Sequence, residues 1–171
     1  MGRSARIALA AAFLLGASAC GGGAAKPEPL GRWLAYDASA RTVTVTALAG
    51  YQGINGGRNF NGYFRGAVLV SSPHGWRVTV KCINLGSVRH SCAIVSDSLA
   101  TRPAFSQSAT RAPTVGLPPG HSAAFSFRPK RLGSYRLASL VGGDELMGMW
   151  DSFEVTRSLR PQVTLLRTYG R

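Results

Sequence analysis

The stretch from Trp76 to Ile83, WRVTVKCI, alternates apolar and polar side chains and decides the fold class of this protein. Every second residue from Trp76 to Cys82 is apolar, and the residues between them are charged or hydroxylated. Successive side chains of a β-strand point to opposite faces, so this period of two predicts a strand with one buried face.

Other short runs of the same kind lie on both sides of this stretch, separated by Gly, Pro and Asn. No window of ten or more residues has a helical period, and no alternation of strands with helices is seen. Several short strands with regular turn signals predict an all-β sandwich or barrel. The expected strands cover residues 42–48, 66–71, 76–83, 91–95, 122–127, 134–141 and 150–155.

Length and composition limit the alternatives. The chain has 171 residues, of which 45% are apolar and 16% charged, with 21 Gly and 9 Pro. These values suit one globular domain and exclude a large multidomain enzyme and general disorder. Three cysteines are too few for a disulfide-built miniprotein. No Ser-His-Asp spacing, phosphate loop or zinc-finger spacing is present, so we expect no enzymatic activity.

The N-terminus has the pattern of an export signal. Arg3 and Arg6 precede the apolar run 7–15, and small residues then lead to Cys20. This ending resembles the lipobox of bacterial lipoproteins, in which the cysteine is lipidated. We therefore expect a lipoprotein signal peptide at 1–19, a lipidated Cys20 with a flexible tether at 20–31, and an extracytoplasmic, membrane-anchored protein of the bacterial cell envelope. Plain secretion and a retained anchor are the alternatives.

A set of short motifs extends over most of the remaining chain. They are NFNGY at 59–63, Gly66, P-x-G-W-x-V at 73–78, Asn84, His-Ser at 90–91, LPPG at 117–120, G-x-Y-x-L at 133–137 and GMW at 148–150. Together they resemble sulfocyanin, a blue-copper protein of the cupredoxin class. The resemblance implies a cupredoxin-like Greek-key β-sandwich of about 7–8 strands over residues 32–156. Residues 157–171 are then a basic C-terminal extension.

The resemblance also implies a role in copper binding and single-electron transfer. A type-1 copper site uses two imidazoles, one thiolate and a weak axial thioether. In the family, one His precedes a long loop, and Cys, His and Met follow at intervals of five on a single C-terminal loop. Counted back from Met149, the His position is Asp144 and the Cys position is Ser139. The chain thus retains ligand positions His90 and Met149 and has substitutions at Ser139 and Asp144.

These substitutions change the expected chemistry. A serine hydroxyl is a poor copper ligand, and a carboxylate favours harder ions. We therefore expect no resident cofactor, with copper the one metal that the resemblance allows, and a non-redox binding or scaffold role in the envelope. The alternative is a weak copper-binding or electron-transfer protein that uses His90 and Met149.

Simpler interpretations exist for the same residues. His90 is then a polar residue that is hydrogen-bonded to the backbone, and Met149 packs against neighbouring aromatic rings. Asp144 and Glu145 are then surface charges on a Gly-rich loop.

Cys82 and Cys92 remain for the folded domain, and both have core-facing parity. The resemblance places their strands in opposing sheets, so a disulfide across the core is one expectation, and export would permit its oxidation. Two buried free thiols are the other expectation.

The formal charge of +13 indicates an anionic partner, although a high Arg content without binding meaning is equally compatible with it. Nucleic acid is not expected for an exported lipoprotein. Anionic lipid headgroups, envelope polymers or an acidic protein suit that compartment, as does an envelope redox or copper-handling protein. Four of the seven acidic residues surround the ligand loop, which predicts one acidic end of the molecule.

Overall fold

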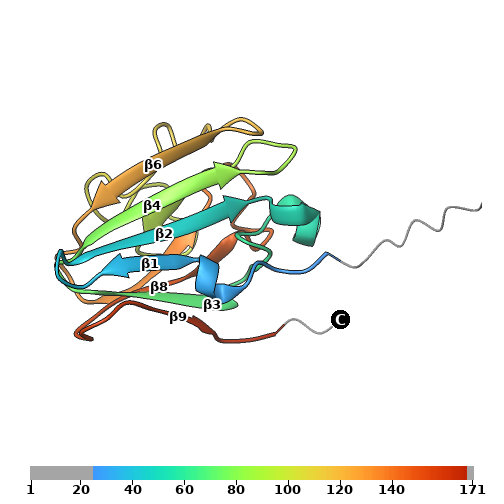
Figure 1. Cartoon of the computed structure of the whole chain (residues 1–171). Coiled ribbons are helices and arrows are strands. Elements are labelled where there is room, and N and C mark those ends of the chain that lie inside the picture. The colour runs from blue at the N-terminus through green and yellow to red at the C-terminus, as the bar shows by residue number, and fades with distance from the viewer. Residues whose placement is uncertain (1–24, 169–171) are drawn as a thin grey trace, which may run out of the picture.

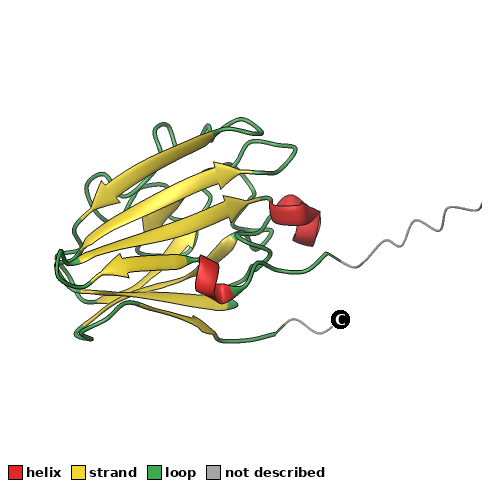
Figure 2. Cartoon of the chain, in the orientation of Figure 1, coloured by secondary structure: helices red, strands yellow, loops and turns green. Residues whose placement is uncertain are grey.

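Two β-sheets pack face to face in a computed structural model that describes residues 25–168 (Figures 1 and 2). The first sheet has the order β1 (Leu34–Asp37), β2 (Thr42–Ala49), β4 (Arg77–Asn84) and β6 (Ser122–Phe127). The second has the order β5 (Ala93–Val95), β7 (Gly133–Ala138), β8 (Trp150–Thr156), β3 (Val68–Pro73) and β9 (Gln162–Leu165). Two 3₁₀ segments, η1 (Leu30–Arg32) and η2 (Tyr51–Gly57), complete the elements. No helix in this described range is long and apolar enough to cross a membrane.

The core lies between the sheets and is built from the alternating side chains that the sequence shows. In β2 and β4 every second residue is buried, among them Val45, Val78 and Val80. Side chains of the second sheet meet them from the other side, for example Phe153 of β8 against Phe127 of β6 at 6.2 Å between ring centroids. The predicted all-β sandwich is therefore confirmed.

The strand directions give the sandwich two distinct ends. β2 pairs with β4 and β3 pairs with β8 in parallel, whereas the other pairs are antiparallel. One end, called the η2 end here, therefore gathers residues 50–66, 85–92 and 139–149 (Figure 1). The opposite end gathers the four connections 38–41, 74–76, 128–132 and 157–161. All candidate ligand positions lie at the η2 end.

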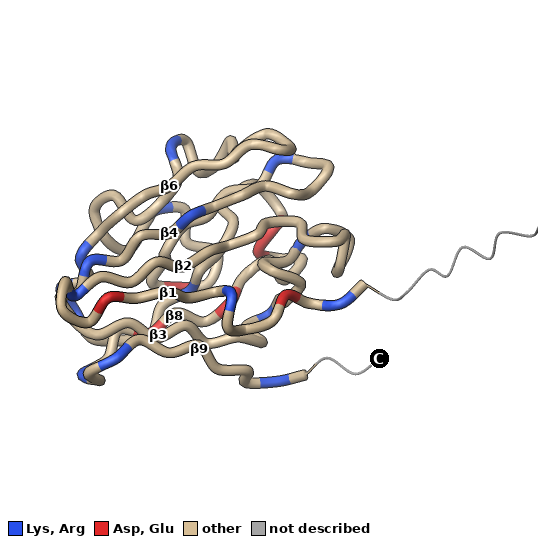
Figure 3. The backbone as a smooth tube through the Cα atoms, viewed as in Figure 1, with Lys and Arg blue, Asp and Glu red and all other residues tan. Residues whose placement is uncertain are grey.

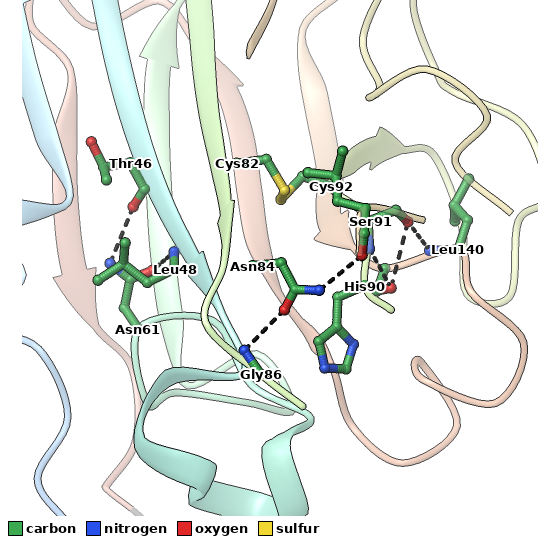
Figure 4. Close-up of a disulfide and its surroundings, with 12 residues drawn as sticks. Thr46, Leu48, Asn61, Cys82, Asn84, Gly86, His90, Ser91, Cys92 and Leu140 are labelled. Atoms are coloured by element: carbon green, nitrogen blue, oxygen red, sulfur yellow. Dashed lines mark hydrogen bonds between the residues drawn. A yellow bond between two sulfur atoms is a disulfide. The ribbon is translucent and has the colours of Figure 1, made fainter. Parts of the chain in front are cut away.

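A disulfide between Cys82 and Cys92 joins the two sheets (Figure 4). Cys82 belongs to β4 of the first sheet, and Cys92 directly precedes β5 of the second. Their Cα atoms are 5.9 Å apart, and both residues are fully buried. The bridge therefore crosses the core two residues from His90.

The NFNGY motif fastens the η2 end to the first sheet. The Asn61 side chain accepts a hydrogen bond from Leu48 N and donates one to Thr46 O, at 2.8 and 3.1 Å (Figure 4). Asn59 donates to Ile54 O at 2.6 Å and accepts from Gly62 N at 2.7 Å. Both asparagines are fully buried, so their amides replace the backbone partners that these irregular turns lack.

Residues 25–168 contain nine strands, more than the seven to eight that the sequence predicted. The two that were not expected are the edge strands β1 and β9, which are short and mostly exposed. β9 lies inside the predicted C-terminal extension and pairs antiparallel with β3. The end of the predicted tether also contacts the domain, because Glu28 is buried and its N–H donates to Asn61 O at 2.8 Å.

Candidate metal centre

The β7–β8 loop, residues 139–149, carries three of the four candidate ligand positions. Its two ends are closed by backbone hydrogen bonds from Ser139 N to Met149 O at 3.2 Å and from Met149 N to Asp144 O at 2.9 Å. The loop faces His90, which lies between β4 and β5 and is held by backbone pairing with Leu117. Asp144, which is 54 positions from His90 in the sequence, is therefore brought beside it.

His90, Ser139 and Asp144 form one hydrogen-bonded group, which we call the His90 cluster. His90 Nδ1 lies 2.8 Å from Asp144 Oδ2, and the Ser139 hydroxyl donates to the same oxygen at 2.6 Å. The exposed fractions of the three residues are 0%, 1% and 3%. An ionised carboxylate only accepts hydrogen bonds, so His90 carries its proton on Nδ1 when Asp144 is charged.

Two neighbouring groups add contacts to the His90 cluster. Ser91 N donates to Ser139 Oγ at 3.1 Å, and Arg58 Nε lies 3.7 Å from Asp144 Oδ1. The buried Asp144 carboxylate is thus surrounded by a hydroxyl, an imidazole and a guanidinium. The hydrogen bonds that Asp144 accepts from His90 and Ser139 hold the β7–β8 loop against His90.

The opposite edge of the imidazole packs against glycine backbone. A Cβ atom on Gly86 would lie 3.0 Å from His90 Nε2, and one on Gly50 would lie 3.4 Å from His90 Cδ2. His90 Nε2 is buried without a hydrogen-bond partner. Asn84 shapes this loop by donating to Val88 O at 2.8 Å. It also accepts from Gly86 N at 2.9 Å (Figure 4). The ring is therefore held between Asp144 and two glycines.

Comparison with known proteins now identifies the family. Residues 30–163 match the family model described as the sulfocyanin (SoxE) domain. The chain belongs to the sulfocyanin family. The cupredoxins that include this family bind copper and carry electrons, and they are generally not enzymes.

Solved cupredoxins share the fold of this sulfocyanin-family chain. Reduced rusticyanin is 22% identical with a TM-score of 0.53, over 71% of this chain and 82% of rusticyanin. Rusticyanin from Thiobacillus ferrooxidans is 20% identical with a TM-score of 0.50, over 73% and 88%. Auracyanin from Roseiflexus castenholzii is 18% identical with a TM-score of 0.49, over 66% and 96%. No curated protein sequence matched the chain.

Two simpler interpretations of the sulfocyanin-like loop are wrong. Asp144 and Glu145 are not surface charges, because both are buried and paired. Glu145 accepts from Arg136 at 2.7 Å and from Leu99 N at 2.9 Å. The His90 ring is hydrogen-bonded to the Asp144 carboxylate and not to the backbone. The partners Arg58 and Arg136 give no local signal in the sequence, so residue pattern alone could not find these pairs.

The predicted acidic end is also wrong. Of the four acidic residues near the loop, Asp144, Glu145 and Asp151 are buried, so their charges do not form a surface. Burial raises the pKa of the Asp151 carboxyl well above its usual range, although Val68 N donates to its Oδ1 at 3.0 Å and opposes that rise.

Met149 is fully buried at the end of the loop, within the main hydrophobic core. Among residues 25–168, no three His, Cys, Asp or Glu side chains come together as a metal-binding group.

Proposed function

We propose that this chain is a non-redox sulfocyanin-family protein of the cell envelope, in which the His90 cluster replaces a type-1 copper site. It acts as a binding or scaffold module, anchored through a lipidated Cys20 and working beside an envelope redox or copper-handling protein. The observation that carries this proposal is the hydrogen bonding of Ser139 and His90 to one oxygen of Asp144.

The donor set of this cluster does not fit type-1 copper. Such a site needs a thiolate and two imidazoles, whereas the loop offers a hydroxyl and a carboxylate. His90 Nδ1 is already hydrogen-bonded to Asp144. A redox carrier also needs one geometry for both oxidation states of copper, and a lone imidazole with a thioether does not supply it.

Copper titration of a soluble chain, residues 21–171, tests the proposal. This chain retains every contact described above. We expect no intense thiolate-to-copper absorption at roughly 600 nm and no stoichiometric Cu(II) heat in calorimetry. An intense band in the unmodified protein would contradict the proposal.

A restoration experiment tests the ligand positions themselves. The double variant Ser139→Cys with Asp144→His places a thiol and a second imidazole beside His90 and should produce the absorption band. The matched control is Ser106→Cys with Asp144→His, because Ser106 is exposed and lies outside the ligand loop. A colourless restoration variant that is still folded would show that these positions do not form the site.

Weak copper binding through His90 and Met149 is the second candidate function. The backbone hydrogen bonds that join Met149 to Asp144 and to Ser139 favour it, because they hold Met149 beside two residues of the His90 cluster. Cu(I) competition with a colorimetric chelator distinguishes the two. Binding that is lost in both His90→Ala and Met149→Leu, but not in His121→Ala, would support this candidate.

The proposed anchor is tested separately. Cys20 and residues 1–24 lie outside the described residues. Detergent partitioning and the mass of the N-terminal peptide should show a diacylated or triacylated Cys20, and Cys20→Ala should block acylation. An N-terminal peptide that begins at Cys20 without added lipid mass would leave simple secretion.

A further inference from the structure

The end of the sandwich opposite η2 carries a continuous surface of cations, which we call the basic surface. Three adjoining hollows share their lining residues there: His74 and Arg157 line two of them, and Lys130 and Arg131 line two. None of the described residues that line these hollows is acidic. Figure 3 shows Lys and Arg gathered at this end. The basic residues of this surface are all exposed: Arg41, His74, Arg128, Lys130, Arg131 and Arg157.

The basic surface is built on loops that are tied to one another. Arg77 N donates to Arg41 O at 2.9 Å, and His74 N donates to Thr156 O at 2.9 Å. Gly75 N donates to Pro129 O at 3.1 Å, and the Arg128 guanidinium returns a bond to Gly75 O at 3.0 Å. Connections 74–76 and 128–132 are thus bonded to each other, and connections 38–41 and 74–76 are each bonded to the end of a strand. The cations on these loops are therefore held close to the sheets.

No carboxylate neutralises these cations from within the described chain. Arg41, Lys130, Arg131 and Arg157 form none of the ion pairs found among residues 25–168. Asp37 is the acidic residue nearest in sequence to Arg41. Its carboxylate accepts hydrogen bonds from Ser39 N and Ala40 N at 2.8 and 3.0 Å.

Two leucines project from the loops of the same surface. Leu159 is 87% exposed and lines a hollow with Arg157, and Leu132 is 42% exposed and lines a hollow with Lys130 and Arg131. The exposed ring of Tyr36 stands beside Trp76, which lines the Leu159 hollow. Apolar loop tips flanked by cations and an exposed aromatic ring are the features that bind a bilayer interface.

We propose that the basic surface docks onto an anionic lipid bilayer. The cations pair with headgroup phosphates, and Leu132 and Leu159 enter the region between headgroups and acyl chains. A soluble anionic polymer would satisfy the cations but would leave both leucines in water, so the leucines favour a bilayer. This inference does not depend on the chemistry of the His90 cluster.

Vesicle co-sedimentation of the chain 21–171 tests the proposal, because this chain lacks Cys20 and any acyl group. We expect strong binding to vesicles of phosphatidylcholine with phosphatidylglycerol and weak binding to phosphatidylcholine alone. Binding should weaken as salt rises, since pairing with headgroups is electrostatic. Equal binding to both vesicle types would overturn the proposal.

Matched variants distinguish the effect of the position of the cations on vesicle binding from the effect of the total net charge. Arg131→Glu with Arg157→Glu should lower the partition coefficient about a hundredfold. Arg102→Glu with Arg111→Glu makes the same charge change on exposed residues outside the basic surface, and should lower it by at most about threefold. An equal loss in both variants would show that net charge alone acts, and would overturn the proposal.

The leucines distinguish a bilayer from a polymer. Leu132→Ser with Leu159→Ser should weaken vesicle binding about tenfold, whereas Leu99→Ser with Leu146→Ser at the η2 end should leave it unchanged. Binding to soluble polyphosphate should be insensitive to both leucine pairs. Vesicle binding that does not respond to Leu132 and Leu159, together with equally tight polyphosphate binding, would assign the surface to a polyanion instead.

Discussion

The β7–β8 loop at the η2 end and the basic surface at the opposite end differ in how their charged side chains are placed. In the loop both carboxylates are buried and paired, Asp144 with His90 and Glu145 with Arg136. At the opposite end Arg131 and Arg157 are exposed and unpaired within the described chain. Buried pairs contribute to the folded structure, whereas exposed cations contribute little to it and remain available to a partner. The comparison predicts that mutations in the His90 cluster change the free energy of unfolding, whereas mutations in the basic surface change binding to vesicles.

The largest effect is expected from Asp144→Ala. This change leaves His90 and Arg58 beside an empty position, and removing one partner of a buried pair costs about 3–5 kcal/mol. Chemical denaturation measures the loss in the free energy of unfolding. Arg157→Ala at the opposite end should change it by no more than about 0.5 kcal/mol. Equal effects at the two ends would contradict the comparison.

The next effect concerns the bridge beside His90. Replacing Cys82 and Cys92 together by Ala should cost about 2–4 kcal/mol, as expected when a short loop loses its disulfide. The mass of the native chain measured without reductant should be two hydrogens lower than after reduction. Full labelling of both thiols in the unreduced native protein would exclude the bond.

A smaller effect is expected from Gly86→Ala. The new Cβ would lie 3.0 Å from His90 Nε2, so the ring or the loop must shift, at a cost of about 1–3 kcal/mol. Gly142→Ala is the matched control, because a Cβ there meets no atom within 4 Å. The His90 imidazole resonances in NMR should move in the first variant and stay in the second. Unchanged resonances in Gly86→Ala would show that the ring is not confined by this glycine.

The smallest expected effect is a dependence of the free energy of unfolding on pH. The raised pKa of buried Asp151 means that the native state keeps a proton that the unfolded chain releases. Its contribution to stability is therefore present below the unfolded pKa and is lost as pH rises towards the folded pKa, by at most about 1.4 kcal/mol per pH unit. Asp151→Asn should remove this loss. The free energy of unfolding of the variant should therefore increase relative to that of the wild type as pH rises. Parallel curves for the two proteins would contradict the assignment.

Sequence reasoning predicted the fold because its strongest signals lie in the buried centre of the sheets. β2 and β4 alternate strictly since one face of each contacts the core. β1 and β9 were missed because edge strands with few buried residues have no such alternation.

At the η2 end, the resemblance to sulfocyanin implied that Ser139, Asp144 and Met149 share one loop, and they lie on the β7–β8 loop. The burial of Asp144 was not predictable in the same way. Its partners His90 and Arg58 are far away in sequence, so no local pattern marks them.

β9 has a consequence for the solubility of the protein. It pairs with the outer side of β3, whose residues are almost all buried. Without Gln162–Leu165, the backbone N–H and C=O groups along that side of β3 would be open to pairing with a strand of another molecule. β9 therefore prevents the edge of β3 from pairing with a strand of another molecule. A chain that ends before residue 162 is expected to aggregate, although most of its core is intact.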